Sequence, residues 1–332
     1  VRHRGGPQAR ERVRGGGPMK RLLAALLLLS VPRAQAAFDA LPTGARAAGL
    51  AGAYTAAASG ADAVFFNPAA LKDLDRPELA AQYGRLAAGL DDGSDISQAM
   101  LAFARPLAGG GAAFSYSSLS LSGLYEERAL SAGYGRGFLD GRLGAGLTLK
   151  LLSTGFDAGP HAENSVDDAG NVQPGAADPA LAGGAGASAA ALDFGLLYRA
   201  SPRLRLGFAA LNLNRPDAGQ GSPVTRTTAL GLAAELGPGV LSLDLLRQEV
   251  LGATADLVGA AGYEARRAYA GQLFFLRGGV RAGGRGQRQL NAGLGWRRGL
   301  LQFDYAMTLP VSMLRPANYS QQVSAVYRFA AP

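Results

Sequence analysis

The stretch Arg142–Leu151, RLGAGLTLKL, carries Leu or Ala at every odd position and Arg, Gly, Thr or Lys at every even one. Successive side chains of a β-strand point to opposite faces, so this period of two predicts a strand with one apolar and one polar face. The same alternation recurs in Arg203–Phe208 and in Gln322–Phe329. The pattern favours an all-β fold whose sheet lies between lipid and a polar space.

Segments of this kind, read between turn signals, number about 14 and are each about ten residues long. We expect strands at 78–88, 96–105, 111–121, 127–137, 142–152, 188–199, 203–213, 225–235, 240–250, 257–267, 272–282, 289–297, 301–309 and 321–329. Tight turns such as Asp140–Gly141 and Ser201–Pro202 alternate with longer connections, of which the longest runs from about Gly155 to Ala187. This layout is typical of bacterial single-chain barrels, which have an even number of strands.

If the chain spans a membrane, it does so with these strands. After residue 36, no apolar run approaches the roughly 20 residues that a membrane helix needs. A closed barrel is the other structure that pairs every backbone group inside lipid. We therefore predict a transmembrane antiparallel β-barrel over residues 78–332.

The first 36 residues have the pattern of a leader. Met19–Arg21 is basic, Leu22–Leu29 is apolar but too short to span a bilayer, and Ala34–Ala36 forms an A-x-A cleavage site. We expect a secretory signal peptide here. Val1–Pro18, which is rich in Arg, Gly and Pro, is interpreted as a mis-called start or a disordered extension, and residues 1–36 are set apart from the fold.

Setting the leader apart changes the charge balance. The whole chain has 33 basic and 25 acidic residues, a formal charge of +8. Eight of the basic residues and one acidic residue lie within residues 1–36, which leaves 25 against 24 and a charge of +1. A nucleic-acid partner is not expected, because phosphate binding requires a cationic face. Cysteine is absent, which excludes disulfides and cysteine-based metal sites.

The residues that support catalysis are few. His161 is the only histidine after the leader, and it lies in the Gly- and Pro-rich connection. We expect no catalytic residues, no cofactor and no enzyme activity. Five acids around it have oxygen ligands suited to Ca²⁺: Asp157, Glu163, Asp167, Asp168 and Asp178. Their spacing matches no EF-hand, and a solvated acidic loop explains them equally well, so no metal site is predicted.

The segment 37–77 differs from everything after it. Phe38–Tyr54 and Ala61–Leu71 are largely Ala and Gly, too poor in large side chains to form a core of their own. Such a segment must pack inside something else. Asn67–Pro68 is a turn or helix-start signal, because Pro has a fixed φ and Asn can cap the helix.

Arg46 and Asp62 are the charged residues of interest in this segment. A guanidinium in a confined lumen persists when its donors are paired, most naturally with a carboxylate. We favour an anchor to the inner wall over a direct contact with a ligand. Lumen-facing basic residues such as Lys150 and Arg328 are expected to balance acids such as Asp193, Asp244 and Asp304.

At these residues the chain resembles outer-membrane barrels of the PorV/PorQ group, relatives of FadL-type fatty-acid channels. The resemblance rests on the Gly-Ala-Arg-Ala run from Gly44, the Gly-rich Ala-Tyr step at Tyr54 and the aromatic-Asn-Pro-Ala box that ends at Ala69. In those relatives this region folds as a hatch inside the barrel. The implied hatch residues are Gly44, Arg46, Gly49, Gly52, Tyr54, Asp62, Asn67, Pro68 and Ala69.

The end of the chain carries a second resemblance. Val323, Ala325, Tyr327 and Phe329 share one face of the last predicted strand, as in the signal by which outer-membrane barrels are recognised for assembly. Here Ala330–Pro332 follow the aromatic residue, whereas the usual pattern ends on it. The alternative interpretation is an ordinary amphipathic last strand. The signal implies outer-membrane lipid and the barrel-assembly machinery as partners.

The resemblance implies two possible functions at the outer membrane of a Gram-negative bacterium. PorV-like relatives are partners of the type IX secretion machinery and bind exported proteins. FadL-like relatives are passive channels for hydrophobic small molecules such as long-chain fatty acids. The longest loop has few large apolar residues, which argues against a high-affinity lipid site. The sequence therefore favours a non-enzymatic partner in protein secretion, with the FadL-like channel as the alternative.

Overall fold

The structure is a computed structural model of the 332-residue chain. It describes residues 38, 44–88, 95–157, 164–166, 171–175, 186–218, 223–249, 254–284, 288–311 and 319–330. The expected signal peptide lies outside the described residues. So do His161 and four of the five loop acids, which are Glu163, Asp167, Asp168 and Asp178.

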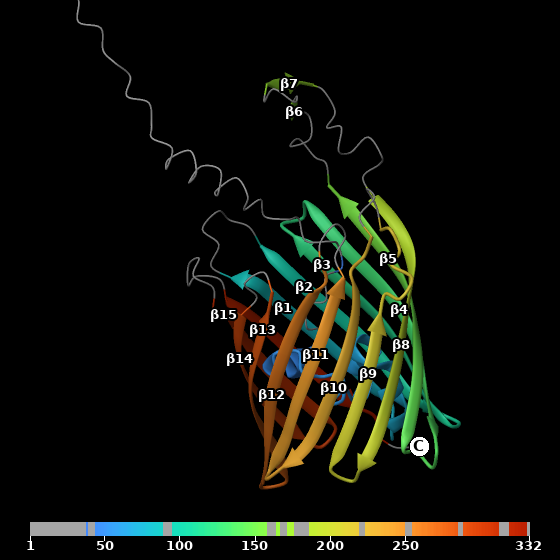
Figure 1. The fold of residues 1–332 in the computed structure, drawn as a ribbon. Helices are drawn as coiled ribbons and strands as arrows, with labels where there is room; N and C mark the ends of the chain where they lie inside the picture. Colours follow the sequence, from blue (N-terminus) through green and yellow to red (C-terminus); the bar gives the residue numbers. More distant parts are fainter. Residues whose placement is uncertain are drawn as a thin grey trace, which may run out of the picture. The chain divides into compact units, whose positions relative to one another are not determined.

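Fourteen antiparallel strands of the described part form a closed barrel (Figure 1). The strands are β1 (Glu78–Ala88), β2 (Ile96–Leu107), β3 (Gly110–Leu121), β4 (Tyr125–Phe138), β5 (Leu143–Phe156), β8 (Gly186–Ser201), β9 (Leu204–Leu211), β10 (Arg226–Leu236), β11 (Gly239–Glu249), β12 (Asp256–Tyr269), β13 (Gln272–Gly283), β14 (Arg288–Arg298), β15 (Leu301–Pro310) and β16 (Tyr319–Arg328). Two short strands, β6 (Asn164–Val166) and β7 (Val172–Pro174), pair with each other. The predicted all-β barrel is confirmed, and each predicted strand corresponds to one barrel strand.

The barrel closes where β1 pairs with β16, with Glu78 opposite Arg328 and Gly84 opposite Gln322. Every other strand pairs with its neighbours in chain order, apart from β6 and β7. Short turns join the strands at the end that holds Glu78, and long connections lie at the opposite end. We call these the short-turn end and the long-loop end.

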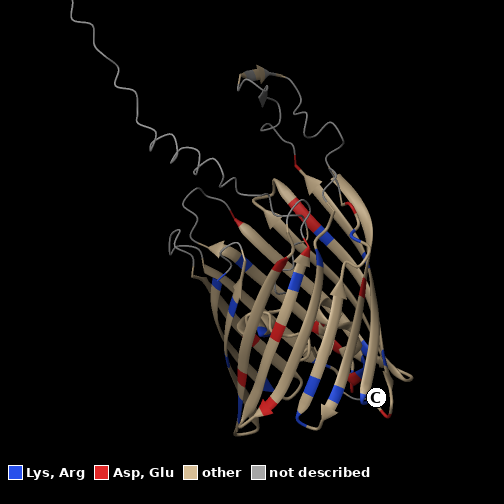
Figure 2. Cartoon of the chain, in the orientation of Figure 1, with Lys and Arg blue, Asp and Glu red and all other residues tan. Residues whose placement is uncertain are grey.

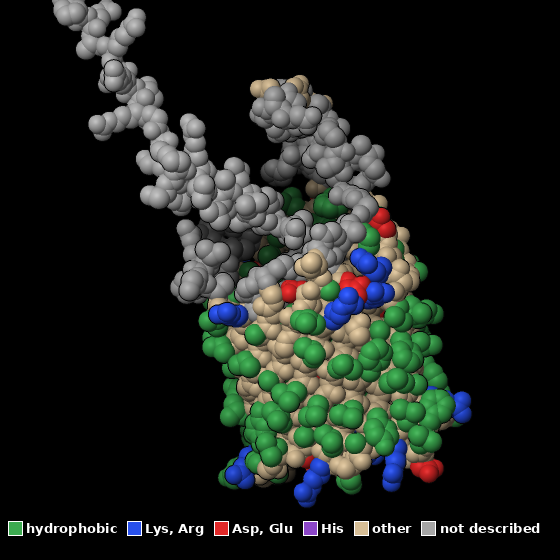
Figure 3. Space-filling view, viewed as in Figure 1, with side chains coloured by type: hydrophobic (Ala, Val, Ile, Leu, Met, Phe, Trp, Pro, Cys, Tyr) green, Lys and Arg blue, Asp and Glu red, His purple; other side chains and the backbone are tan. Residues whose placement is uncertain are grey.

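The alternation along β5 separates the two faces of the wall. Leu147, Leu149 and Leu151 are exposed on the outside, whereas Gly146 and Thr148 are buried on the inside. This is the arrangement that the period of two predicts. Figure 3 shows a band of hydrophobic side chains on the face of the barrel in view, with charged side chains above and below it, and Figure 2 shows charged residues both at the strand ends and within the strands. Among the described residues, no helix is both long enough and apolar enough to span a membrane.

The luminal segment, Gly44–Leu74, precedes the barrel and contacts its inner wall. It contains four short helical turns: α2 (Ala45–Gly49), η1 (Gly60–Asp62), α3 (Ala63–Phe66) and η2 (Pro68–Asp73). Helices of this length are not stable alone, so tertiary contacts must hold them. The small side chains allow close packing, and almost all of the segment's apolar residues are buried.

Glycines of the wall make room for this segment. A Cβ atom on Gly195 of β8 would lie 2.1 Å from the Asn67 side-chain oxygen, and one on Gly262 of β12 would lie 2.7 Å from the Leu50 carbonyl oxygen. Such distances are shorter than any real contact, so larger residues at these positions would push the segment away. The wall glycines that contact the segment in this way lie on many strands: Gly111, Gly135, Gly144, Gly146, Gly195, Gly207, Gly231, Gly262 and Gly279.

β9 is the shortest strand of the described barrel: it ends at Leu211, while its neighbour β8 continues toward the long-loop end. Beyond β9 the chain turns inward, because Ala218 and Val224 are buried against Leu152 and Ala191 on the inner face. This inward turn narrows the lumen at the long-loop end.

Candidate site in the barrel lumen

Arg46 of α2 links the luminal segment to the wall. Its Nε and Nη2 atoms donate to the two carboxylate oxygens of Glu264 on β12, at 2.8 and 3.0 Å. Its Nη1 atom donates to the Tyr54 hydroxyl at 3.1 Å and to Ser59 Oγ at 2.7 Å. Both ends of this guanidinium are therefore satisfied within the lumen. Paired arginine and carboxylate groups of this bidentate form are among the stronger polar contacts in proteins.

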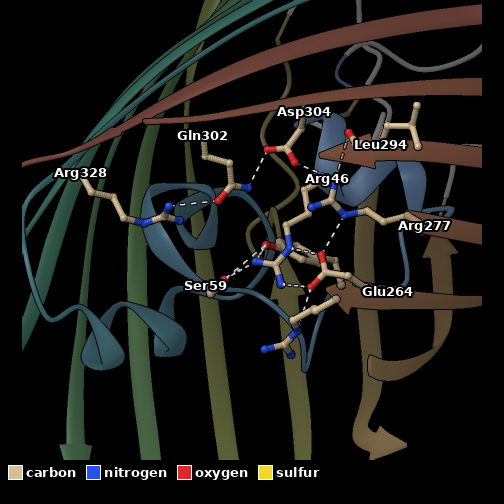
Figure 4. A network of polar contacts seen from close by, with 10 residues as sticks. Arg46, Ser59, Glu264, Arg277, Leu294, Gln302, Asp304 and Arg328 are labelled. Carbon is tan, nitrogen blue, oxygen red and sulfur yellow. Dashed lines mark hydrogen bonds and ion pairs between the residues drawn. The ribbon is translucent and has the colours of Figure 1, made fainter. Parts of the chain in front are cut away.

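A polar network continues from Glu264 along the wall (Figure 4). Arg277 of β13 donates to Glu264 at 2.8 Å and to Asp304 of β15 at 2.7 Å. Gln302 donates to the second oxygen of Asp304 at 2.8 Å and accepts from Arg328 at 3.0 Å. The side chains of Arg277, Glu264 and Asp304 are almost completely buried. Each buried charge therefore has an opposite charge as a partner, which its burial requires.

The network returns to the luminal segment on the far side. Arg328 of β16 pairs with Glu78 of β1 at 2.8 Å, across the seam where the barrel closes. The other carboxylate oxygen of Glu78 accepts the backbone N–H of Ala61 in η1 at 3.1 Å. Arg46 and Ala61 are thus joined through one chain of contacts that crosses β12, β13, β15, β16 and β1.

Further contacts hold the middle of the segment. Asp244 of β11 accepts the backbone N–H groups of Tyr54 and Thr55 at 3.0 and 2.8 Å. Asn291 of β14 donates to the Ala48 carbonyl at 2.8 Å. A segment with few large side chains is therefore fixed mainly by polar contacts to wall residues.

Asn67 has the role that its sequence pattern predicts. Its side-chain oxygen accepts the N–H of Ala69 at 3.1 Å, which caps η2, and Pro68 is the first residue of that turn. Its side-chain amide donates to the carbonyls of Thr55 and of Leu196 on β8, both at 3.0 Å. The residue thus caps a turn and also contacts the wall.

Asp62 lies in the same region and is half-buried. Loss of solvent raises the pKa of its carboxyl to about 7. Arg46 acts in the opposite direction, and the nearby charges of Asp304 and Glu78 raise the pKa further. A carboxyl of this kind changes its charge near neutral pH.

A cavity of about 170 Å³ lies between the luminal segment and the wall toward the long-loop end. Its lining mixes apolar and polar side chains, from both the segment and the strands. The apolar lining is Phe38, Phe65, Phe66, Leu119, Ala129, Leu152, Leu211, Ala229 and Leu246. The polar lining is Thr55, Gln98, Ser117, Ser118, Glu127, Ser131, Lys150, Asn212, Thr227 and Arg281.

The structure brings the expected hatch residues together in the lumen. Gly44 and Gly52 have φ of 105° and 79°, a conformation that favours glycine. Gly49 packs close to Gly293 of the wall, and the Tyr54 ring meets Phe66 edge-on at 5.0 Å. The three assembly-signal residues lie elsewhere, with Val323, Tyr327 and Phe329 exposed on the outer face at the chain's end.

Sequence reasoning found some of the wall residues but not all. Lys150 and Asp193 were both expected among the lumen-facing charges, without a specific pairing, and they form an ion pair at 2.7 Å. Glu264, the main partner of Arg46, and Arg277 were not identified. Both fall at inward positions of predicted strands, where a charged residue is unusual enough to have been a signal. Among the described residues, no group of three metal-ligating side chains lies together.

The fold and lumen together define a class: a closed barrel of fourteen antiparallel strands with an apolar outer band. Solved structures share this fold. The Ralstonia pickettii toluene transporter TbuX is 15% identical, with a TM-score of 0.56 over 88% of this chain and 100% of that one. The Pseudomonas putida toluene transporter TodX is 13% identical, with a TM-score of 0.58 over 88% of this chain and 98% of that one. A Pseudomonas aeruginosa FadL homologue is 12% identical, with a TM-score of 0.55 over 87% of this chain and 98% of that one. No family model and no curated protein sequence matches the chain.

Proposed function

We propose that this protein is an outer-membrane channel for small hydrophobic molecules, with the luminal segment as its hatch. The observation that carries the proposal is the cavity between the luminal segment and the wall, toward the long-loop end. The barrel around it has the fold of toluene transporters. The exposed apolar band supports a membrane location, because a soluble protein rarely exposes so large an apolar surface. Short turns at one end and long loops at the other support an orientation with the long-loop end outside the cell.

The lining and size of the cavity favour a compact ligand. Phe38, Phe65 and Phe66 supply aromatic surface, and Leu152 and Leu246 supply aliphatic surface. A volume of about 170 Å³ is close to that of engineered apolar cavities that bind benzene. It is smaller than the pockets of larger ligands, which start at about 300 Å³. We therefore propose a single-ring aromatic or similarly small hydrophobe rather than a long-chain fatty acid.

The secretion role favoured by the sequence has less support. It rests on the resemblance of the N-terminal motif to PorV-like proteins. TbuX and TodX, which share the fold, are toluene transporters by their names, and this supports the channel alternative better. The channel is therefore the function we propose.

Uptake by intact cells tests this function. The protein is expressed in a Gram-negative host whose own channels for hydrophobic molecules have been deleted, and entry of radiolabelled toluene and oleate is measured. We expect faster toluene entry than in cells without the protein, and little change for oleate. Equal toluene entry with and without the protein would overturn the proposal.

A matched pair of variants connects uptake to the cavity. Ala129→Phe places a ring in the cavity, because Ala129 lines it from the inner face of β4. Ala132→Phe adds the same ring three residues on, where the side chain is exposed on the outer face. We expect the first variant to lose most of the uptake and the second to retain it. Equal uptake by both variants would mean that the ligand does not pass through this cavity.

A further inference from the structure

Three arginines surround one carboxylate on the outside of the barrel at the long-loop end. Arg226 of β10 lies 2.5 Å from Glu249 of β11, and Arg215, from the turn after β9, lies 3.9 Å from the same oxygen. Arg247 of β11 contacts the other oxygen of Glu249. Glu249 is largely covered, whereas the side chains of the arginines are 34 to 55% exposed. These four side chains together therefore carry more positive than negative charge.

We call Arg215, Arg226 and Arg247 the arginine cluster. The strand register places Arg226 and Arg247 on the outer face, and Arg215 joins them through its contact with Glu249. Arg226 is opposite Glu249, and Arg247 is opposite Thr228. The residues on either side of Arg247, which are Leu246 and Gln248, are buried on the inner face. Figure 3 shows basic and acidic side chains together above the hydrophobic band, on the face where β10 and β11 lie.

The cluster is held in place before any ligand binds. Arg226 and Arg247 belong to paired strands. Arg215 lies in the turn after β9, where its backbone N–H donates to the Asn212 carbonyl at 2.9 Å. The Asn212 backbone N–H donates to Asp193 at 2.8 Å, and its side-chain amide donates to the Thr225 carbonyl at 2.9 Å. The Nε atom of Arg215 is buried and has no hydrogen-bond partner among the residues that the structure describes. Glu249 alone does not occupy the donors of three guanidiniums, since each carries five N–H groups.

Directly beneath the cluster lies a continuous apolar surface. Leu245 and Leu243 follow Arg247 on the outer face of β11, and Leu230 lies opposite Leu245 on β10. Leu257 of β12 is opposite Arg247 itself. These four leucines are 41 to 60% exposed. A molecule that fits this surface has an anionic head at the level of the arginines and apolar chains along the leucines.

We propose that the arginine cluster binds the phosphate group of an outer-leaflet lipid whose acyl chains lie along Leu230, Leu243, Leu245 and Leu257. Arginine recognises phosphate through paired N–H donors, and several guanidiniums can share one phosphate. The height of the cluster, at the upper edge of the apolar band, is where a lipid headgroup lies. The site rests on the proposed membrane location but is independent of the molecule that the channel carries.

Lipid binding to the purified barrel tests the site. The probe is diphosphoryl lipid A, compared with the same lipid after removal of its phosphates, and binding is followed by native mass spectrometry in a mild detergent. We expect the intact protein to retain the phosphorylated lipid preferentially. The triple variant Arg215→Gln, Arg226→Gln and Arg247→Gln should bind it about tenfold or more weakly, because several charge-assisted hydrogen bonds are lost.

The matched control removes three exposed arginines at the short-turn end, as Arg105→Gln, Arg136→Gln and Arg267→Gln. It changes the net charge equally and should leave binding almost unchanged. Heat-dependent migration on a denaturing gel shows that both variants are folded. Equal weakening in the two variants would overturn the site, and so would equal binding of the dephosphorylated lipid. Inorganic phosphate that binds as tightly as the lipid would show a free-anion site instead. Cell-uptake results do not enter this test, so its outcome is separate from that of the channel.

Discussion

At the scale of single residues, the lumen depends on charges that neutralise one another away from solvent. Arg46 illustrates this, since it reaches from the luminal segment to Glu264 on the wall and also contacts Tyr54 and Ser59. Burying a charge is costly unless an opposite charge and further hydrogen bonds replace water. The pair therefore specifies where the segment sits more than it adds net stability.

Removing one member of such a pair leaves the other without compensation. We expect Arg46→Ala to destabilise the protein by about 3 kcal/mol, because Glu264 would lose a bidentate partner in a buried site. Thermal unfolding in detergent measures the effect. The control is Arg85→Ala, which breaks the exposed pair with Asp95 and should cost less than about 1 kcal/mol. If both variants unfolded at the same temperature, the anchoring role of Arg46 would be wrong. If toluene binding fell while stability was unchanged, Arg46 would be a ligand contact instead.

Asp62 gives the lumen a dependence on pH. Its pKa is about 7 in the folded protein, against about 4 in an unfolded chain. The folded form therefore holds a proton that the unfolded form releases between these values, so this residue's contribution to stability falls as pH rises from about 4 to about 7. We expect Asp62→Asn to have a smaller difference in melting temperature between pH 5 and pH 8 than the natural protein. An identical pH dependence in both proteins would contradict this.

At the scale of elements, the wall glycines decide how closely the luminal segment can pack. We expect Gly262→Ala to displace the segment, because the added Cβ would meet the backbone of Leu50 at 2.7 Å. Gly259→Ala, on the same strand, is the control, since its Cβ would meet its nearest atom at 3.9 Å. Limited proteolysis and melting temperature compare the two. We expect faster cleavage within the segment only in the first variant, and equal cleavage in both would show that the contact tolerates a methyl group.

The elements also show what the sequence can predict. Strand positions follow from a period of two that is read within ten residues, so β1 and β13 are predicted to within one residue of their bounds. The partner of Arg46 lies 218 residues away, and no local pattern encodes that pairing. The early end of β9 at Leu211 was also missed, because the alternation continues to Leu213 although the chain has already turned inward.

At the scale of the whole molecule, the barrel and the luminal segment have separate sources of stability. The strand ladder is closed by pairing between β1 and β16 and does not pass through the segment. The segment, in contrast, depends on the wall for its hydrogen bonds, as the contacts of Asp244 and Asn291 show. A barrel without the segment should therefore still fold, whereas the segment without the barrel should not.

This asymmetry leads to a prediction on conductance. Deleting Gly44–Leu71 removes the side chains that fill the lumen, and the charged residues of the wall, such as Glu264 and Asp304, then become accessible to water. We expect the shortened protein to insert into planar bilayers and to conduct ions several-fold better than the full chain, because a water-filled lumen replaces a packed one. Heat-dependent gel migration verifies that the barrel has formed. Arg46→Ala, which loosens the segment without removing it, should give brief openings to the same larger conductance. If the deletion left the conductance unchanged in a folded barrel, the segment would not be the element that closes the lumen, and the hatch role would be wrong.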